Sequence, residues 1–281
     1  MIHDREMLEE MTATRAAHMP PLARLSRLVS SVPRFLLVAA LVGASAVFIA
    51  SPEIDISVSR HFFDGEGFPA TGDAVLRLIR SAGIHLTAFI IVASLAAVAF
   101  AAVSGRMTSP RPSRALFVLS VYLAGPGLAV NAILKEVWGR ARPRELIEFG
   151  GDGVFSPVWI VAGSCVGNCS FSSGEAASAA ALLSLLVLVP KSDRKTLGLG
   201  LFTVALVLSV NRIAFGGHFL SDVVVSWLLV LLIAVCLFPL FSGARGEAID
   251  RVVLGSRARA AAWWRGVRWA AAAGRLRRRS G

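Results

Sequence analysis

Six long apolar segments constrain this chain more than any other feature of its sequence. A bilayer is crossed by roughly 20 helical residues, and the segments approach or exceed that length. They cover residues 35–51, 84–103, 115–134, 172–189, 197–214 and 219–241. In lipid every backbone amide must be hydrogen-bonded within its own element, so the segments are expected to be helices. The sequence therefore predicts an all-α polytopic membrane protein with six transmembrane helices.

The composition agrees with a membrane protein and disfavours the other classes. Hydrophobic residues make up 55% of the chain and charged residues 17%, whereas soluble domains carry about a quarter charged residues. A disordered chain is excluded, as is a disulfide scaffold, because there are only three cysteines in 281 residues. Four acidic residues precede the first apolar segment, which is unlike the basic start of a signal peptide. The segment is therefore interpreted as an uncleaved anchor.

The distribution of Lys and Arg predicts the orientation in the membrane. Of these 29 residues, 21 lie in the two terminal tails and the 106–114 and 191–195 loops. Because positive loops stay on the cytoplasmic side, both termini should be cytoplasmic and the other loops periplasmic, in a bacterial inner membrane. The net charge of +11 then reflects topology. The expected partners are the bilayer and a membrane lipid, with no nucleic acid, and the oligomeric state is not predicted.

Three regions follow from this topology. Residues 1–34 form a cytoplasmic tail, 35–243 a six-helix transmembrane domain, and 244–281 a basic cytoplasmic tail. The last tail interleaves Arg with Trp263, Trp264 and Trp269. This pattern fits an interfacial amphipathic helix and equally a solvated basic tail near anionic lipid. On the opposite side, residues 53–64 should form a short helix on the membrane surface.

Polar residues gather on the predicted outer side, at the mouth of the bundle. Lys135, Arg142 and Arg212 supply three cations, and the two guanidinium groups match phosphate oxygens in bidentate fashion. Ser173 and Gly174 stand where the fourth helix begins, where free backbone N–H groups and the helix dipole favour an anion. Gly174 also permits close approach of a ligand. These residues predict a phosphate-binding site.

A candidate nucleophile follows in the same region. His218 and Asp222 are four residues apart, so on a helix they share a face. A carboxylate bonded to one imidazole nitrogen fixes the tautomer and makes the other nitrogen a better nucleophile. The cations, the helix start and the oriented imidazole together predict phosphoryl transfer.

Less specific interpretations exist for the same residues. His218 could be a structural histidine, and Lys135 and Arg142 could extend to the interface as snorkelling side chains. Arg140 and Arg144 are interpreted as loop charges that contact head groups more than as ligands of the phosphate. Ionisable groups at membrane depth are nevertheless functional-site candidates by default.

The polar residues fall into three blocks of sequence. These are Lys135-x6-Arg142-Pro143, Ser173-Gly174 and Arg212-x5-His218-x3-Asp222. Their order and the six-helix layout resemble the type 2 phosphatidic acid phosphatase superfamily, which also includes vanadium haloperoxidases. The resemblance implies that His218 forms a phosphohistidine, that Asp222 orients it, and that the other block residues hold the phosphate. It implies no metal or other cofactor, because protein cations do the electrostatic work.

The sequence departs from the family pattern at three positions. Ser172 stands where the family has Pro, and Asn211 where it has Ser. Glu175 stands where the family has the His that protonates the leaving group. A buried carboxylic acid can do this work, although the surrounding cations favour the carboxylate. Alternatively, Glu175 completes a capping box with Ser172. Both interpretations stay open.

The expected function is metal-independent hydrolysis of a phosphomonoester or diphosphate on a membrane lipid. The run Cys-Ser-Phe-x-Ser-Gly-Glu at 169–175 resembles variant bacterial members and favours lipid A. Polyprenyl diphosphate, phosphatidylglycerol phosphate and phosphatidic acid are the other candidates. One alternative is a phosphotransferase that passes the phosphoryl group to a second lipid. Another is a catalytically silent lipid-binding homologue, because Glu175 replaces the family His.

The cysteines predict one disulfide. Cys165 and Cys169 enclose Val-Gly-Asn, which favours a tight turn, and the outer side is an oxidising compartment. A Cys165–Cys169 bond would stiffen the approach to Ser173. A zinc site is a poor rival, with only two thiols and no neighbouring His. Cys236 is expected to be a free, buried thiol.

Overall fold

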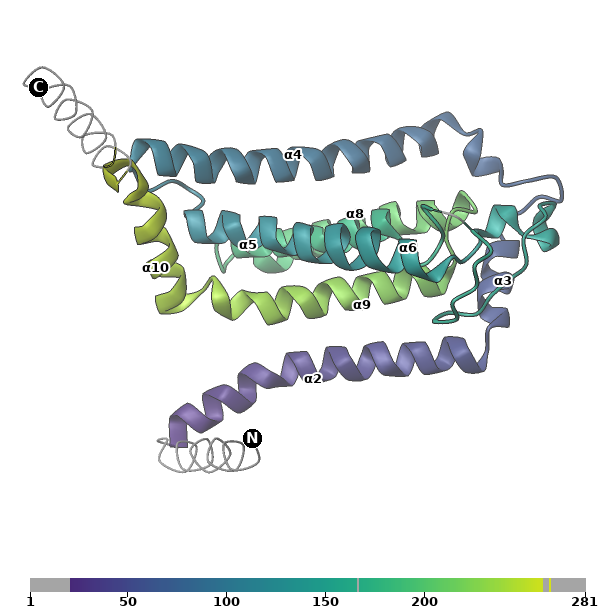
Figure 1. Cartoon of the computed structure of the whole chain (residues 1–281), viewed down its shortest axis with the longest axis horizontal. Helices are drawn as coiled ribbons and strands as arrows, with labels where there is room; N and C mark the ends of the chain where they lie inside the picture. Colours follow the sequence, from purple (N-terminus) through teal and green to yellow (C-terminus); the bar gives the residue numbers. More distant parts are fainter. Residues whose placement is uncertain (1–20, 166, 260–262, 264–281) are drawn as a thin grey trace, which may run out of the picture.

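The structure, a computed structural model, describes residues 21–165, 167–259 and 263. Within these residues the regular secondary structure is helical, which confirms the all-α prediction. The α-helices of this part are α2 (Pro21–Ala50), α3 (Glu53–Arg60), α4 (Ala74–Ser104), α5 (Pro112–Tyr122), α6 (Lys135–Trp138), α7 (Gly174–Ala181), α8 (Arg194–Ala214), α9 (Leu220–Leu237) and α10 (Gly243–Leu254). The long helices run along a common direction as a bundle (Figure 1).

Five helices in the described part of the chain are long and apolar enough to cross a membrane. The fourth predicted span is shorter, an apolar helix over Gly174–Val187 formed by α7 and the 3-10 segment η5 (Leu182–Val187). Five alanines on α7, at positions 176, 177 and 179–181, are at most 2% exposed. Small side chains let neighbouring helices approach closely, and α7 packs against α8 and α9. A central helix enclosed in this way does not itself have to match the bilayer thickness.

The third predicted span has an irregular second half. Helix α5 continues into η2 (Leu123–Leu134), a π-helical segment with Pro126 inside it. Proline has no N–H to donate to the preceding turn, and a wider turn accommodates that loss. Segment η2 leads directly into α6, so this span ends by presenting Lys135.

The outer faces of the bundle are apolar. Phe35, Phe89 and Leu199 are 73%, 68% and 69% exposed, and soluble proteins rarely expose many such side chains together. These faces fit contact with lipid. Cys236 on α9 is also exposed, so the prediction that it is buried is wrong. An apolar stretch has the same composition whether its residues face lipid or protein.

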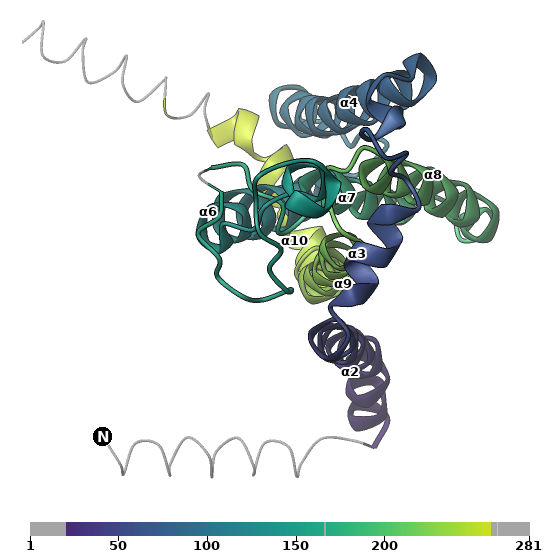
Figure 2. The same ribbon diagram turned by 90° about the vertical axis from the view of Figure 1, so that its right-hand side faces the viewer.

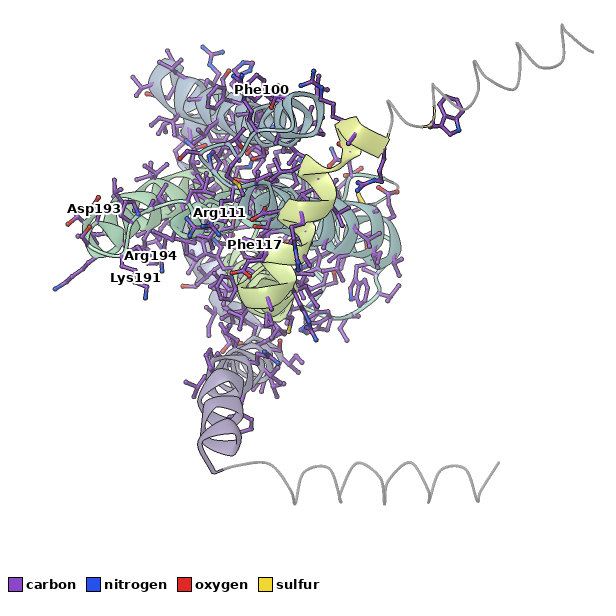
Figure 3. The ribbon with its side chains drawn as sticks, turned by 90° about the vertical axis from the view of Figure 1, so that its left-hand side faces the viewer. Phe100, Arg111, Phe117, Lys191, Asp193 and Arg194 are labelled. Carbon is purple, nitrogen blue, oxygen red and sulfur yellow. A yellow bond between two sulfur atoms is a disulfide. The ribbon has the colours of Figure 1, made fainter. Side chains whose placement is uncertain are left out.

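The two ends of the bundle differ. Helix α3 and the loops that precede α7 lie at one end, and the start of α2 and helix α10 lie at the other (Figures 1 and 2). Helix α3 forms within the predicted surface segment. Helix α10 crosses the opposite end, where Arg111, Lys191 and Arg194 also lie (Figure 3). The tail residues 264–281, with Trp264 and Trp269, and residues 1–20 lie outside the described part, so the amphipathic tail helix stays a prediction.

Candidate active site

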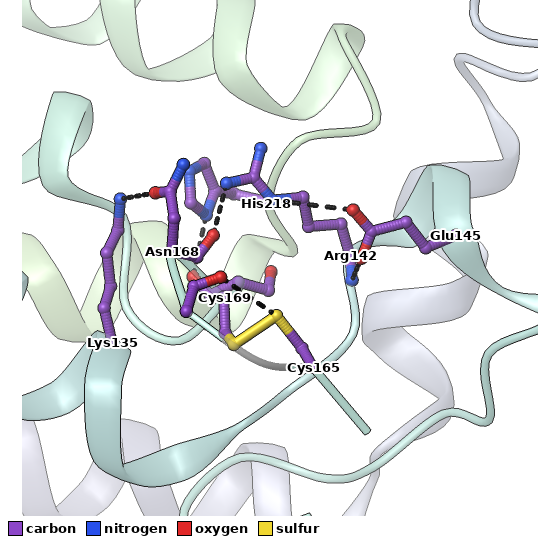
Figure 4. The surroundings of a disulfide bond; sticks show 9 residues. Lys135, Arg142, Glu145, Cys165, Asn168, Cys169 and His218 are labelled. Atoms are coloured by element: carbon purple, nitrogen blue, oxygen red, sulfur yellow. Dashed lines mark hydrogen bonds and ion pairs between the residues drawn. A yellow bond between two sulfur atoms is a disulfide. The ribbon is translucent and has the colours of Figure 1, made fainter. Parts of the chain in front are cut away.

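The three sequence blocks meet at the α3 end of the bundle. Lys135 begins α6, Ser173 caps α7, and Arg212 lies in the last turn of α8. Figure 4 shows Lys135, Arg142 and His218 around the 165–169 turn. Residues far apart in sequence are therefore collected by the ends of four different segments.

His218 is 2% exposed and stands in the turn before α9. Its Nδ1 lies 2.8 Å from the backbone carbonyl oxygen of Ser170. A carbonyl oxygen only accepts, so Nδ1 carries the proton and the neutral ring keeps a lone pair on Nε2. Burial lowers the pKa of His218 to about 4, so the ring is neutral near pH 7. The imidazole is therefore neutral, fixed in one tautomer and free to react through the Nε2 lone pair, which are the properties that a nucleophile requires.

Asp222 lies in the first turn of α9 and is fully buried. Its Oδ2 accepts from the Ser170 hydroxyl at 2.5 Å and from the Phe219 N–H at 2.9 Å. The same Oδ2 is 3.7 Å from Nδ1 of His218, which is beyond hydrogen-bond distance. Ser170 therefore joins the two residues, since its hydroxyl donates to Asp222 and its carbonyl accepts from His218.

Two residues of this centre were missed by sequence reasoning. Arg140 was interpreted as a loop charge that contacts head groups, and this interpretation is wrong, because the side chain is 1% exposed. Its Nη1 donates to Asp222 Oδ1 at 2.5 Å and its Nη2 to Asp55 Oδ2 at 2.8 Å. Asp55, on α3, had no assigned role. Burial raises the pKa of the Asp55 carboxyl, and the charge of Arg140 opposes that rise. Arg144 is exposed.

Asn168 lies between two of the predicted phosphate ligands. Lys135 donates from Nζ to Asn168 Oδ1 at 3.1 Å, and Arg142 donates from Nη2 to the Asn168 carbonyl oxygen at 2.5 Å (Figure 4). The Nε of Arg142 also lies 3.8 Å from Oε1 of Glu145. The oxygens of Asn168 thus gather two cations of different segments toward one place.

Arg212 is 2% exposed. Its Nε lies 3.3 Å from Glu175 Oε1, and neither Nε nor Nη1 makes a hydrogen bond with any residue that the structure describes. Buried guanidinium donors are rarely left without acceptors, so these atoms are suited to bind an anionic ligand. Gly217 permits this placement, because a Cβ there would lie 2.6 Å from Nη2 of Arg212.

Glu175 is tied to two basic residues. Arg80 on α4 donates to its carboxylate from Nε at 3.1 Å and from Nη2 at 3.0 Å. With Arg212 on the other side, the carboxylate joins α4, α7 and α8. Nothing in the sequence around Arg80 distinguishes it from the neighbouring Arg77, so this partner of Glu175 could not be predicted from the sequence.

The capping box proposed for Glu175 does not form. Ser173, not Ser172, is the N-cap of α7, and its hydroxyl accepts from the Ala176 N–H at 3.2 Å. Glu175 is consequently the second helical residue and does not bond back to the cap. At Gly174 a Cβ would collide with the amide side chain of Asn131, so close packing within the protein itself requires this glycine.

Cys165 and Cys169 are joined by a disulfide, with their Cα atoms 5.7 Å apart. The bond closes the turn that carries Asn168 (Figure 4). This turn leads through Ser170 to the N-cap of α7, so it connects the Lys135–Arg142 pair with the His218 acceptor.

A cavity of about 190 Å³ opens beside the site, between α4 and the central helices. Arg80, Lys135 and Glu175 line its polar part. Ile84, Leu182 and Leu208 are among its apolar lining residues. A pocket with this division suits an amphiphilic ligand whose charged group is placed near the cations.

The chain is similar in sequence to several known proteins. The sequence profile described as the PAP2 superfamily matches residues 114–245. A lipid A 4′-phosphatase from Rhizobium leguminosarum is 38% identical over 211 residues, which cover 69% of this chain and 90% of that protein. A lipid A 4′-phosphatase from Rhizobium etli is 39% identical over 210 residues, 69% of this chain and 82% of that protein.

A third relative, a lipid A 4′-phosphatase from Francisella tularensis subsp. novicida, is 38% identical over 116 residues, 40% of this chain and 51% of that protein. No solved structure gives a significant match. The family profile includes the site residues from Lys135 to Asp222. The chain therefore belongs to the PAP2 superfamily, and it is a phosphatase.

Proposed function

We propose that this chain hydrolyses the 4′-phosphate of lipid A, or a closely similar phosphate of a membrane glycolipid, through a phosphohistidine at His218. The observation that carries the proposal is the buried His218 imidazole, fixed through Nδ1 by the Ser170 carbonyl at 2.8 Å. That bond leaves Nε2 as the reacting atom. The phosphorus–oxygen bond to the sugar breaks as the bond to Nε2 forms, and water then cleaves the phosphohistidine to release phosphate.

The phosphate oxygens would be held by cations from three segments. Arg212 offers two buried donors that have no hydrogen-bond acceptor among the described residues. Lys135 and Arg142 both donate to oxygens of Asn168. Phosphate oxygens could take the place of these acceptors when substrate binds. The start of α7 adds its N–H groups and dipole. Hydrogen-bond donors that are already in place around the charge of the transition state make the largest contribution to the rate enhancement of many enzymes.

Glu175 has a role in this site that differs from the family His. Its carboxylate holds Arg80 through Nε and Nη2 and lies 3.3 Å from Nε of Arg212. We infer that it positions these two guanidinium groups for the phosphate. The sugar oxygen would then take its proton from water as it leaves. If Glu175 supplied that proton, its loss would slow poor leaving groups more than good ones.

A lipid substrate is supported by the cavity and by the relatives. The cavity beside Lys135 and Glu175 has apolar walls from α4, α7 and α8, which suits hydrocarbon next to a charged head group. The matched relatives are named lipid A 4′-phosphatases. With the positive-inside rule, the proposal places the chain in the bacterial inner membrane, with both termini cytoplasmic and the site periplasmic.

Phosphate release by the purified full chain in detergent tests the proposal. The panel consists of lipid A, undecaprenyl diphosphate, phosphatidylglycerol phosphate and phosphatidic acid, each with EDTA present. We expect lipid A to give the highest kcat/KM and the product to have lost the 4′-phosphate. Release from lipid A that is no faster than from the other three lipids would contradict the substrate. Appearance of the phosphate on a second lipid instead of in solution would contradict hydrolysis.

A further inference from the structure

We propose that Asp55 and Arg140 are positioning residues for His218, acting through Asp222 and Ser170. The inference rests on the proposed role of His218 and goes beyond it, because Asp55 lies outside the three sequence blocks and Arg140 is one of the six unspecified positions between Lys135 and Arg142. Asp55 comes from the surface helix α3, and Arg140 from the loop after α6. Their side chains are each 1% exposed.

Arg140 is fixed on every side. Its Nε donates to the Ser156 carbonyl oxygen at 2.8 Å, and its Nη1 donates to the Ser221 hydroxyl at 2.9 Å in addition to Asp222. Its guanidinium carbon lies 4.2 Å from the ring centre of Phe219, within the range of a cation–π contact. A planar guanidinium with this many fixed partners has one orientation, so it defines where Asp222 Oδ1 lies.

Asp55 holds Arg140 and Ser221 in place through both of its carboxylate oxygens. Its Oδ1 accepts from the Ser221 N–H at 2.9 Å, which caps the first turn of α9. Its Oδ2 accepts from the Ser221 hydroxyl at 2.5 Å and from Arg140 at 2.8 Å. Asp55 thus fixes both Arg140 and the helix turn that carries Asp222.

The chain of contacts ends at the nucleophile. With Oδ1 held by Arg140, Asp222 turns Oδ2 to the Ser170 hydroxyl at 2.5 Å. The Ser170 carbonyl then accepts from His218 Nδ1. Buried polar networks lose more than one contact when a member is removed, because the remaining groups are left without partners. A change at Asp55 should therefore misplace the imidazole without touching a phosphate ligand.

The test uses Asp55→Asn and Ser170→Ala in the full chain, assayed with lipid A and with p-nitrophenyl phosphate. Asn keeps the shape of Asp55 but faces Arg140 or Ser221 with a donor. Ala removes the Ser170 hydroxyl and keeps its carbonyl. We expect each variant to lower kcat about 10–100-fold, because misplacing a reacting group by about 1 Å can cost about 100-fold, with KM changed less than about twofold because the phosphate ligands are intact.

Two controls match these changes. Asp250 is a buried carboxylate that accepts the Ser113 N–H at 2.7 Å at the opposite end of the bundle, so Asp250→Asn makes the same kind of change away from the site. Ser184 is a buried serine whose hydroxyl has no hydrogen bond to a described residue, so Ser184→Ala matches Ser170→Ala. Both controls should keep wild-type kcat.

The double variant Asp55→Asn/Ser170→Ala separates positioning from general weakening of the fold. If both residues act along one path to His218, the combined loss in kcat should be clearly smaller than the product of the two single losses. A fully multiplicative loss, wild-type kcat in Asp55→Asn, or an equal loss in Asp250→Asn would overturn the inference. Failure of this inference can be told apart from failure of the proposed function. A wild-type protein that is inactive on lipid A would overturn both, whereas an active wild type with unaffected variants would overturn the inference alone.

If Asp55→Asn does not fold, Asp55→Glu and Ser170→Ala carry the same test. Glu keeps the charge at a displaced position, so a folded Asp55→Glu variant should lose kcat with KM retained. Wild-type kcat in both of these variants would equally overturn the inference.

Discussion

The Nδ1 atom of His218 lies 2.8 Å from the backbone carbonyl oxygen of Ser170. A backbone acceptor keeps its hydrogen-bonding character at any pH and in any side-chain variant. The backbone position of Ser170, just before α7, therefore sets the tautomer of the candidate nucleophile. Asp222 holds Ser170 in that position by accepting its hydroxyl hydrogen bond.

Replacement of the nucleophile gives the first prediction. His218→Ala should lower phosphate release by more than about 10³-fold, because the covalent route is lost, and acid-labile phosphate should no longer be trapped on the protein. His61→Ala is the matched control, since His61 makes a similar bond, from Nδ1 to the Ser57 carbonyl oxygen at 2.8 Å, on the exposed surface. Near-wild-type turnover in His218→Ala would exclude the phosphohistidine.

The acid limb of the pH profile gives the second prediction. Burial lowers the pKa of His218 from 6.5 to about 4, and only the neutral ring attacks. The limb of kcat/KM that depends on His218 should thus lie near pH 4, with no loss of activity as the pH falls through 6.5. A limb centred near pH 6.5 would contradict a buried, neutral nucleophile.

The same shift predicts a change in stability. Between pH 6.5 and about 4 the unfolded chain binds a proton that the native His218 does not, so the free energy of unfolding falls as the pH falls through this range. Above pH 6.5 this contribution is fully present. Unfolding midpoints measured from pH 4 to 7 should show a weaker pH dependence in His218→Asn than in the wild type.

Glu175 gives the third prediction. Glu175→Gln should lower kcat about tenfold, because small misplacements of groups at the reacting centre cost about 10–100-fold. If Glu175 acts by holding Arg80 and Arg212, the loss should be equal for p-nitrophenyl phosphate and for an alkyl phosphate. A proton donor would matter more for the alkyl substrate, whose leaving group is poor. A clearly larger loss on the alkyl substrate would therefore identify Glu175 as the acid.

Some of this site could be predicted from the sequence, and some could not. The three blocks lie at the ends of apolar segments, so helix geometry alone places Arg212, His218 and Asp222 at one end of a bundle. Contacts across the fold carry no such signal. Asp55 is separated from Arg140 by 85 residues, and Arg80 from Glu175 by 95. No sequence motif around these four residues predicts which acid pairs with which base.

The failed expectations have related physical causes. The spacing of Ser172 and Glu175 fits a capping box, but Arg80 holds that carboxylate with charge-assisted hydrogen bonds. Arg212 pairs with the same carboxylate at 3.3 Å, and α7 begins one residue later. The burial of Cys236 was read from hydropathy, which measures apolar character and not whether lipid or protein covers a residue. The length of α7 differs from a full span because neighbouring helices enclose it.

The disulfide gives the fourth prediction. In protein from intact cells, Cys165 and Cys169 should resist alkylation without reductant and become labelled after reduction, as read by peptide mass spectrometry. Cys236 is the internal control, since it is a free thiol exposed on α9 and should be labelled in detergent without reductant. Labelling of all three cysteines before reduction would show that the bond is absent in the cell.

Vanadate inhibition gives the last prediction. Vanadate adopts the trigonal-bipyramidal geometry of a phosphoryl group in transfer, so fixed cationic donors should bind it well. Arg212 holds two buried donor atoms, Nε and Nη1, that make no hydrogen bond with a described residue. Arg212→Lys keeps the positive charge but loses the planar pair of donors, so we expect the inhibition constant for vanadate to rise at least tenfold and kcat/KM to fall in parallel.

Arg77→Lys is the control for this variant, because Arg77 is an exposed α4 residue one turn from Arg80, and it should change neither quantity. The measurements are made with EDTA present, so that the protein's own cations carry the anion binding. Unchanged vanadate inhibition in Arg212→Lys would show that these donors do not face the transferred phosphate. Loss of wild-type activity to EDTA, with recovery on adding a divalent ion, would assign part of the charge stabilisation to a metal.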